Sequence, residues 1–82
     1  MAQKSSLPTL DLHGFKTDDV FDAVEKFLNR NQNKSQVRIM PGKGGGKVRA
    51  KVEEYLRLAG YPWNFERIDG RVNEGVMVVY ME

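Results

Sequence analysis

The sequence predicts an α/β fold, a two-layer sandwich in which two helices cover one face of a four-stranded mixed sheet. Two segments carry apolar residues at helical spacing, and short β-prone runs stand before, between and after them. Glycine, proline or asparagine separates these segments, so the predicted element order is β-α-β-α-β-β. Because β-α-β crossovers are right-handed, both helices should lie on the same face of the sheet, and the last two strands should form a hairpin.

The first strand and the first helix come from the N-terminal third of the chain. Residues 9–13 alternate between polar and apolar side chains, which predicts a strand, and Gly14 then allows a sharp turn. Thr17 is the expected N-cap, and two acidic residues follow in the first turn, where the helix dipole favours negative charge. The helix should end near Asn31. Its apolar stripe comprises Val20, Val24, Phe27 and Leu28.

The second strand and the second helix flank a glycine-rich loop. Residues 37–40 are β-branched or apolar at most positions and predict a strand that is buried against a helix. The loop over residues 41–47 follows directly. Apolar residues at helical spacing predict a helix over residues 48–59, with Gly60 as its C-cap and Pro62 just beyond it.

Two further strands are predicted in the C-terminal part. Residues 65–68 form the third strand, an Asp69-Gly70 turn and a polar stretch to Gly75 follow, and residues 76–81 form the fourth strand. Three aromatic residues alternate before and within the third strand, and they would either stack nucleobases on an exposed face or pack over the edge of the sheet, which is the simpler use. These residues are Tyr61, Trp63 and Phe65.

The chain should form a single domain over residues 9–82. Residues 1–8 are polar and show no periodicity, so we expect a disordered tail there. The total of 82 residues allows one hydrophobic core and no second domain.

Composition excludes several classes of protein. The chain has no cysteine and a single histidine, so it has no disulfide framework, no thiolate metal site and no multi-histidine zinc site. Its apolar runs are too short to span a membrane, and its first residues lack a signal peptide, so we expect a cytoplasmic protein without a membrane partner. The net charge of +2 is modest, but the basic residues are clustered. Six of them, and no acidic residue, lie between residues 34 and 52: Lys34, Arg38, Lys43, Lys47, Arg49 and Lys51.

Asp11 and His13 are the residues best placed to carry chemistry. Strand alternation puts both on the face opposite Leu10 and Leu12, at the end of the first strand. The loops after the first and second strands should emerge at the same edge of the sheet, so His13 and the glycine-rich loop should face one crevice. The alternative is structural, with His13 as a hydrogen-bonding residue and Asp11 as an acceptor for nearby backbone N–H groups.

The glycine-rich loop predicts a phosphate site. It precedes a helix start, where backbone N–H groups and the helix dipole bind anions, and Lys43, Lys47 and Arg49 add positive charge. Two nucleotide-binding motifs do not match. A Walker loop needs four residues between its first glycine and its Gly-Lys pair and then Ser or Thr, but only three residues separate Gly42 from Gly46, and Val48 follows Lys47. A dinucleotide fingerprint needs a third glycine where Lys47 or Arg49 stands. A flexible connector is the alternative interpretation of the loop.

The chain resembles the Smr (small MutS-related) domain family over nearly all of residues 10–80. Leu10-Asp11-Leu12-His13-Gly14 looks like the first motif of the family, and residues 42–49 look like its second motif, His-Gly-x-Gly followed by a basic helix start. Residues 73–79 are similar to the glycine-then-strand ending, which is a weaker match. The resemblance implies the same β-α-β-α-β-β sandwich, similar to the C-terminal domain of translation initiation factor 3.

The resemblance also implies nucleic-acid binding, and several members of the family nick DNA or cleave RNA. By position, Asp11 and His13 would be the catalytic pair, with His13 as general acid or base and Asp11 either orienting it or holding a divalent ion such as Mg²⁺. The nucleic-acid-binding residues would be Gly42, Lys43, Gly44, Gly46, Lys47 and Arg49.

One residue departs from the family pattern. Pro41 stands where the second motif opens with histidine. If that histidine only shapes the loop, activity survives, and the resemblance then implies a nucleic-acid-binding domain with endonuclease activity on DNA or RNA, by hydrolysis or transesterification. If the histidine assists catalysis, Pro41 supports an alternative from another class. In that alternative the domain is a non-catalytic module that binds nucleic acid, or an adaptor on a ribosome or repair complex, and has lost cleavage.

Overall fold

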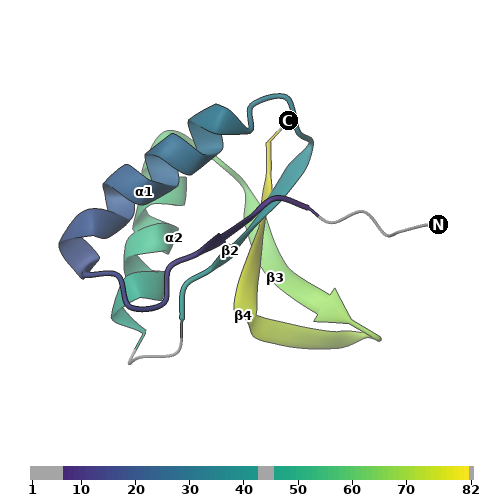
Figure 1. Ribbon diagram of the computed structural model, residues 1–82. Coiled ribbons are helices and arrows are strands. Elements are labelled where there is room, and N and C mark those ends of the chain that lie inside the picture. The colour runs from purple at the N-terminus through teal and green to yellow at the C-terminus, as the bar shows by residue number, and fades with distance from the viewer. Residues whose placement is uncertain (1–6, 43–45, 82) are drawn as a thin grey trace.

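The computed structural model describes residues 7–42 and 46–81, which form a sheet of four strands with two helices on one face (Figure 1). The strand order is β1-β2-β4-β3, with β1 parallel to β2 and β4 antiparallel to both of its neighbours. The predicted mixed sheet and α/β sandwich are confirmed. The elements in chain order are β1 (Thr9–Asp11), α1 (Thr17–Arg30), β2 (Gln36–Met40), α2 (Lys47–Ala59), β3 (Trp63–Ile68) and β4 (Arg71–Tyr80).

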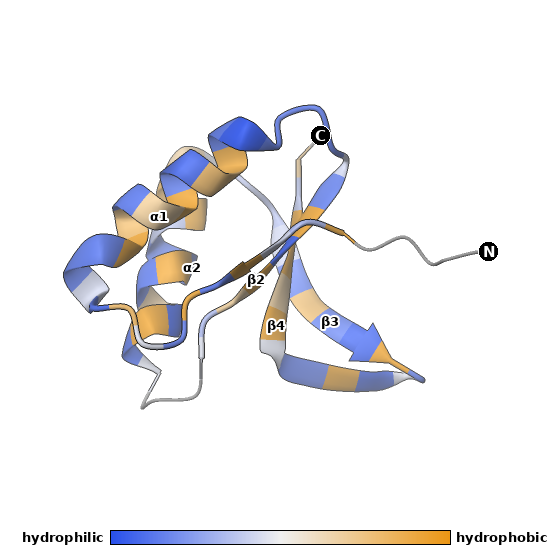
Figure 2. Ribbon diagram, in the orientation of Figure 1, coloured by the Kyte–Doolittle hydropathy of each residue, from blue (hydrophilic) through white to orange (hydrophobic). Residues whose placement is uncertain are grey.

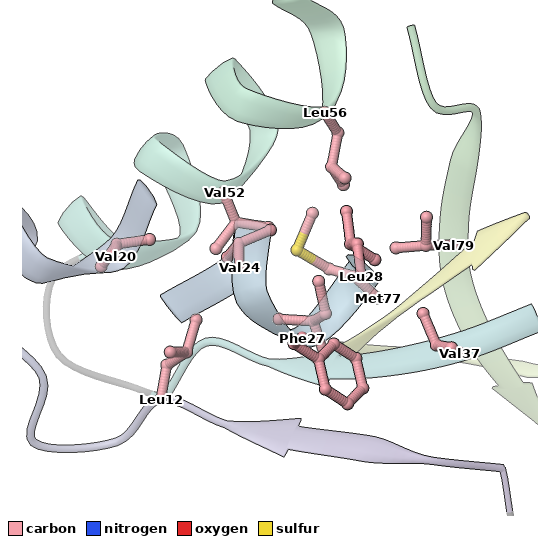
Figure 3. Close-up of a cluster of buried hydrophobic side chains, with 11 residues drawn as sticks. Leu12, Val20, Val24, Phe27, Leu28, Val37, Val52, Leu56, Met77 and Val79 are labelled. Carbon is pink, nitrogen blue, oxygen red and sulfur yellow. The ribbon is translucent and has the colours of Figure 1, made fainter. Parts of the chain in front are cut away.

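The hydrophobic core fills the space between the sheet and the helices (Figure 3). Figure 2 shows hydrophobic and hydrophilic bands alternating along both helices, as expected of helices with one buried side. No polar or charged residue of the described chain is buried. Apolar burial of this kind is the main stabilising term for a small domain. The buried cluster comprises Leu12, Val20, Val24, Phe27, Leu28, Val37, Ile39, Val52, Leu56, Met77 and Val79.

The start of α1 differs from the prediction by one residue. Thr17 is already helical, and Lys16 occupies the N-cap position without a side-chain hydrogen bond to the helix. The prediction of Thr17 as N-cap was therefore wrong. Asp18 and Asp19 lie in the first turn as expected, so the favourable charge at the helix start does not depend on a side-chain cap.

Both ends of α2 are set by glycines in the left-handed conformation. Gly46 precedes the helix with φ 82°, and Gly60 ends it with φ 82°. The Gly60 N–H donates to the Arg57 carbonyl at 3.3 Å, and the Tyr61 N–H donates to the Leu56 carbonyl at 2.9 Å. The predicted C-cap at Gly60 is confirmed, since only glycine adopts this conformation without strain.

The hairpin of β3 and β4 is longer than predicted. The polar stretch that we expected after the Asp69-Gly70 turn belongs to β4, which begins at Arg71 instead of Val76, and β3 begins at Trp63. Asp69 and Gly70 both have positive φ, as in the two-residue turns that suit the twist of a hairpin. Backbone hydrogen bonding next to this turn extends both strands, although most residues of their outer halves are polar and the apolar Ile68 and Val72 there are exposed. Figure 1 shows the outer part of the hairpin pointing away from the helices.

The aromatic residues Tyr61, Trp63 and Phe65 pack against the core. The rings of Trp63 and Phe65 meet edge to face with centroids 5.0 Å apart. Packing over the sheet, the simpler of the two predicted uses, is thus what these residues do.

Residues 1–6 of the expected tail lie outside the described residues. Pro8 is described, and its carbonyl accepts a hydrogen bond from the Arg38 N–H at 2.8 Å, directly before β1. No helix of the described chain is long and apolar enough to cross a membrane.

Candidate functional site

Leu12 positions the two residues of the first motif. Its side chain is fully buried, and its N–H donates to the Met40 carbonyl at 2.9 Å, which continues the pairing of β1 with β2. Because successive side chains of an extended segment point to opposite sides, Asp11 and His13 project away from the core. The predicted separation of polar and apolar side chains around this strand end is confirmed.

Asp11 and His13 form a pair that is open to solvent. The Asp11 Oδ1 accepts a hydrogen bond from the backbone N–H of His13 at 3.0 Å and lies 3.3 Å from the ring Nδ1. The side chains are 53% and 82% exposed, respectively. The N–H of His13 is the largest cause that lowers the pKa of Asp11 below its ordinary value, and the imidazole adds to the effect. The Asp11 carboxylate thus accepts a hydrogen bond from the backbone of His13 and also orients its imidazole ring.

Gly42 brings the loop after β2 against His13. Its φ is 90°, and a Cβ at this position would lie 3.3 Å from the His13 Cα. Glycine is therefore required twice, for the left-handed backbone and for the close approach. This contact confirms that the loops after β1 and β2 meet at one crevice. Lys43 and Gly44, which we also predicted as site residues, lie outside the described residues.

The crevice is a hollow of about 580 Å³ beside Asp11 and His13. Its lining combines the ends of two parallel strands with the middle of β4, and it is mainly apolar. We call it the strand-end hollow. Its lining residues are Asp11, His13, Met40, Gly42, Asn73, Gly75 and Val76.

The contribution of β4 to this hollow was not predicted. The register between β3 and β4 shifts between Phe65 and Glu66, because Phe65 pairs with Met77 whereas Glu66 pairs with Asn73. The intervening residues 74–76 of β4 form a bulge, and two of them, Gly75 and Val76, line the hollow. In the sequence, the one signal for these residues was the glycine-then-strand ending of the family resemblance.

The side chain of Asn73 holds the bulge together. Its Oδ1 accepts a hydrogen bond from the Gly75 N–H at 3.0 Å, and its Nδ2 donates to the Glu66 Oε1 at 3.4 Å. Glu66 in turn pairs with Arg38, whose Nε lies 3.0 Å from Oε2 and whose Nη2 donates to Oε1 at 3.1 Å. This network connects β2, β3 and the bulge on the side of the sheet opposite the helices.

The basic residues of the predicted site differ in what they contact. Lys47, the first residue of α2, is exposed and makes no ion pair within the described part of the chain. Arg49 lies 3.7 Å from Glu53 and 3.9 Å from Glu74, and its guanidinium lies 5.6 Å from the centre of the Phe65 ring. Neither residue, nor Gly46, lines the strand-end hollow. Lys47 is thus the better placed of the two to meet an anion.

The described residues contain no group of three or more histidine or acidic side chains that could hold a metal ion. Asp11 is the carboxylate at the strand-end hollow, and its Oδ1 is engaged by His13. These residues therefore do not form a metal site by themselves.

These features define a small α/β sandwich with an aspartate–histidine pair where its two parallel strands end. A model of the Smr domain matches residues 10–82, and the chain belongs to the Smr domain family.

Two similar proteins extend this assignment. The chain is 35% identical over 74 residues to the endonuclease MutS2 of Caldanaerobacter subterraneus subsp. tengcongensis, a match that covers 88% of this chain and 9% of that protein. The structure of this chain is similar to the crystal structure of the Smr domain of Thermus thermophilus MutS2, with a TM-score of 0.77 and 27% sequence identity. This alignment covers 90% of this chain and 96% of the other.

Proposed function

We propose that this domain binds DNA or RNA at the strand-end hollow and cleaves a phosphodiester bond with His13 and Asp11. The observation that carries the proposal is the exposed Asp11–His13 pair held against Gly42. A polymer needs an open site, and both side chains are accessible. The relation to a MutS2 endonuclease supports a nucleic-acid substrate.

His13 is the proton carrier of the proposed reaction. With Oδ1 of Asp11 beside Nδ1, the favoured neutral tautomer carries its proton on Nδ1 and leaves Nε2 able to accept one. His13 would remove a proton from the attacking oxygen, or give one to the leaving oxygen, as the phosphorus–oxygen bond breaks. Asp11 would hold the ring in this orientation.

The start of α2 is the proposed binding place for the phosphate charge. Backbone N–H groups at a helix start attract anions, and the first turn of α2 carries no acidic residue. Lys47 and, in our proposal, Lys43 and Gly44 of the glycine-rich loop add to this attraction. The glycine-rich loop and Lys43 would stabilise the charge that builds up on the phosphoryl oxygens during the reaction.

Binding without cleavage is the second candidate function, and Pro41 favours it. The family motif places a histidine at this position, whereas the proline is buried and offers no group that could transfer a proton. If cleavage requires that second imidazole, the domain would bind nucleic acid without cleaving it. It would then act as an adaptor on a ribosome or a repair complex.

The test is incubation of the purified domain with supercoiled DNA, single-stranded RNA and structured RNA, with Mg²⁺ or with a chelator. We expect cleavage of one substrate, and we expect His13→Ala to reduce its rate about 10²- to 10⁴-fold while binding is retained. Cyclic phosphate ends would identify attack by the ribose 2′-OH, and their absence would identify attack by water. Asn33→Ala, in the exposed turn after α1, is the control and should leave the rate unchanged.

Two results would contradict the proposal. A rate that is the same in His13→Ala and in the unchanged chain would remove His13 from catalysis. Binding without cleavage of any substrate would establish the second candidate function.

A further inference from the structure

We propose that the strand-end hollow accepts an unpaired nucleobase, so that the domain recognises single-stranded or extruded nucleotides in preference to regular duplex. This inference rests on the proposed function, because it concerns the nucleotide next to the phosphate whose cleavage His13 would assist. It adds a specificity that neither the Asp11–His13 pair nor the family assignment supplies.

The lining of the hollow suits the flat, apolar face of a base. Met40 and Val76 provide aliphatic surface, and Gly42 and Gly75 have no side chains that would fill the space. The volume of about 580 Å³ lies in the range of pockets that bind small molecules. Pockets that take an extruded base hold it between aromatic or apolar side chains. A phosphate group alone would make no favourable contact with such an apolar lining.

The polar groups at the hollow place the base relative to the reacting phosphate. Asp11 is the last residue of β1 and His13 lies in the turn just after it, whereas Asn73 lies in β4 next to the bulge. A nucleotide with its base between Met40 and Val76 would therefore have its sugar and phosphate within reach of His13. The bulge of β4 is what makes this arrangement available, because it brings Asn73, Gly75 and Val76 to the hollow.

Asn73 does not provide strong discrimination among bases. Its Oδ1 accepts one hydrogen bond from the Gly75 N–H and its Nδ2 donates one to Glu66, so the bulge and not a base sets the orientation of the amide. A site that reads base identity needs donors and acceptors that are not engaged elsewhere. The expected preference is therefore for an accessible base of any kind.

Duplex nucleic acid should bind more weakly at this site. In a duplex both faces of each base are stacked, and the base must be extruded before it can enter a pocket, which costs free energy. Single strands, loops and mismatches avoid most of this cost.

The experiment compares affinities of the full chain for labelled strands of about ten nucleotides, a length within the usual range of single-strand sites. The probes are a mixed-sequence DNA single strand, the same strand with every base removed, the matching duplex and an RNA single strand, all at low ionic strength. We expect the base-bearing strand to bind about tenfold more tightly than the abasic strand, which carries the same phosphates. The DNA and RNA arms identify which sugar the site prefers.

Met40→Ala is the diagnostic variant. It removes apolar lining and should abolish most of the tenfold difference, while the affinity for the abasic strand stays the same. Val78→Ala is the control, because Val78 pairs with Arg38 on the same side of the sheet as Met40 but does not line the hollow. It should change neither affinity.

Three outcomes would overturn the base pocket. Equal binding of base-bearing and abasic strands would remove it and leave the proposed nucleic-acid function intact. An equal loss of both affinities in Met40→Ala would show that the lining supports the backbone contact only. Failure of every strand to bind would overturn the base pocket and the proposed function together.

Discussion

The core of the domain and its strand-end hollow differ in the polarity, exposure and backbone conformation of their residues. In the core, each helix turns an apolar stripe toward the sheet, the buried residues are apolar, and α1 begins with acidic residues that suit its dipole. At the strand-end hollow, a histidine and an aspartate are exposed, Gly42 has a left-handed backbone, β4 bulges, and α2 begins with a lysine. Both regions take residues from β2 and β4, and the buried Leu12 lies in the chain between the exposed Asp11 and His13.

This difference indicates which residues serve stability and which serve binding. Features that oppose local stability persist at functional sites when the rest of the fold supports them. The cationic start of α2 is the clearest example, because the same helix would be more stable with an acid there. Changes in the core should therefore alter stability, and changes at the strand-end hollow should alter activity.

The largest expected effect is that of Leu56→Ala. Leu56 of α2 is fully buried, and its truncation should lower the free energy of unfolding by about 2–5 kcal/mol through lost burial and the cavity that remains. Leu58→Ala on the same helix is the control, because Leu58 is 65% exposed and should change stability by less than about 0.5 kcal/mol. Urea denaturation measures both. Similar losses in the two variants would mean that the buried stripe is misassigned.

Gly42→Ala should affect both stability and activity. A left-handed alanine costs about 1–2 kcal/mol, and its Cβ would also press on the His13 Cα. Gly60→Ala is the matched control, since Gly60 has a similar φ of 82° but open space around it. Both variants should lose stability, whereas only Gly42→Ala should shift the NMR signals of His13 and lower cleavage or binding. Unchanged His13 signals in Gly42→Ala would contradict the contact between the two loops.

Lys47→Glu should separate stability from binding. An acid at the start of α2 should stabilise the domain by about 0.3–1 kcal/mol, because it suits the helix dipole. Affinity for nucleic acid should fall. The slope of log affinity against log salt concentration should become less steep by about 1 or more, because fewer counterions are released. Lys34→Glu makes the same charge change in the turn before β2 and should leave the affinity nearly unchanged. An equal loss of affinity in both variants would indicate that overall charge, and not the start of α2, attracts the nucleic acid.

The smallest expected effect concerns the pKa of Asp11. The backbone N–H of His13 is the largest cause of its lowered pKa, so in His13→Ala the pKa should stay below its ordinary value. Since the pKa of Asp11 is lower in the folded chain than in the unfolded chain, its stabilising contribution is present above the unfolded pKa. That contribution is lost as the pH falls through the folded pKa.

Carbon-13 NMR titration of the Asp11 carboxyl measures this shift directly. Asp11→Asn should weaken the acid dependence of unfolding relative to the unchanged chain. Return of the Asp11 pKa to its ordinary value in His13→Ala would show that the imidazole, and not the backbone, is the main cause.

The sequence by itself determined the elements that local patterns encode. Helical spacing of apolar residues gave both helices, Gly60 gave the end of α2, and the alternation around Leu12 placed Asp11 and His13 on the exposed side. These features depend on neighbours within a few residues, so they can be read along the chain. The expectation that the loops after β1 and β2 meet came from the parallel arrangement of the strands that they follow.

Only the tertiary structure decided what β4 does. Its place between β2 and β3, its polar outer half and its bulge depend on pairing with strands that are distant in the sequence. The same applies to Arg38, whose charge is met by Glu66 from β3, and to Arg49, which lies near Glu74 of β4. Register and bulges follow from the balance of contacts across the whole sheet. For this reason the residues that complete the strand-end hollow, Asn73, Gly75 and Val76, became apparent only in the fold.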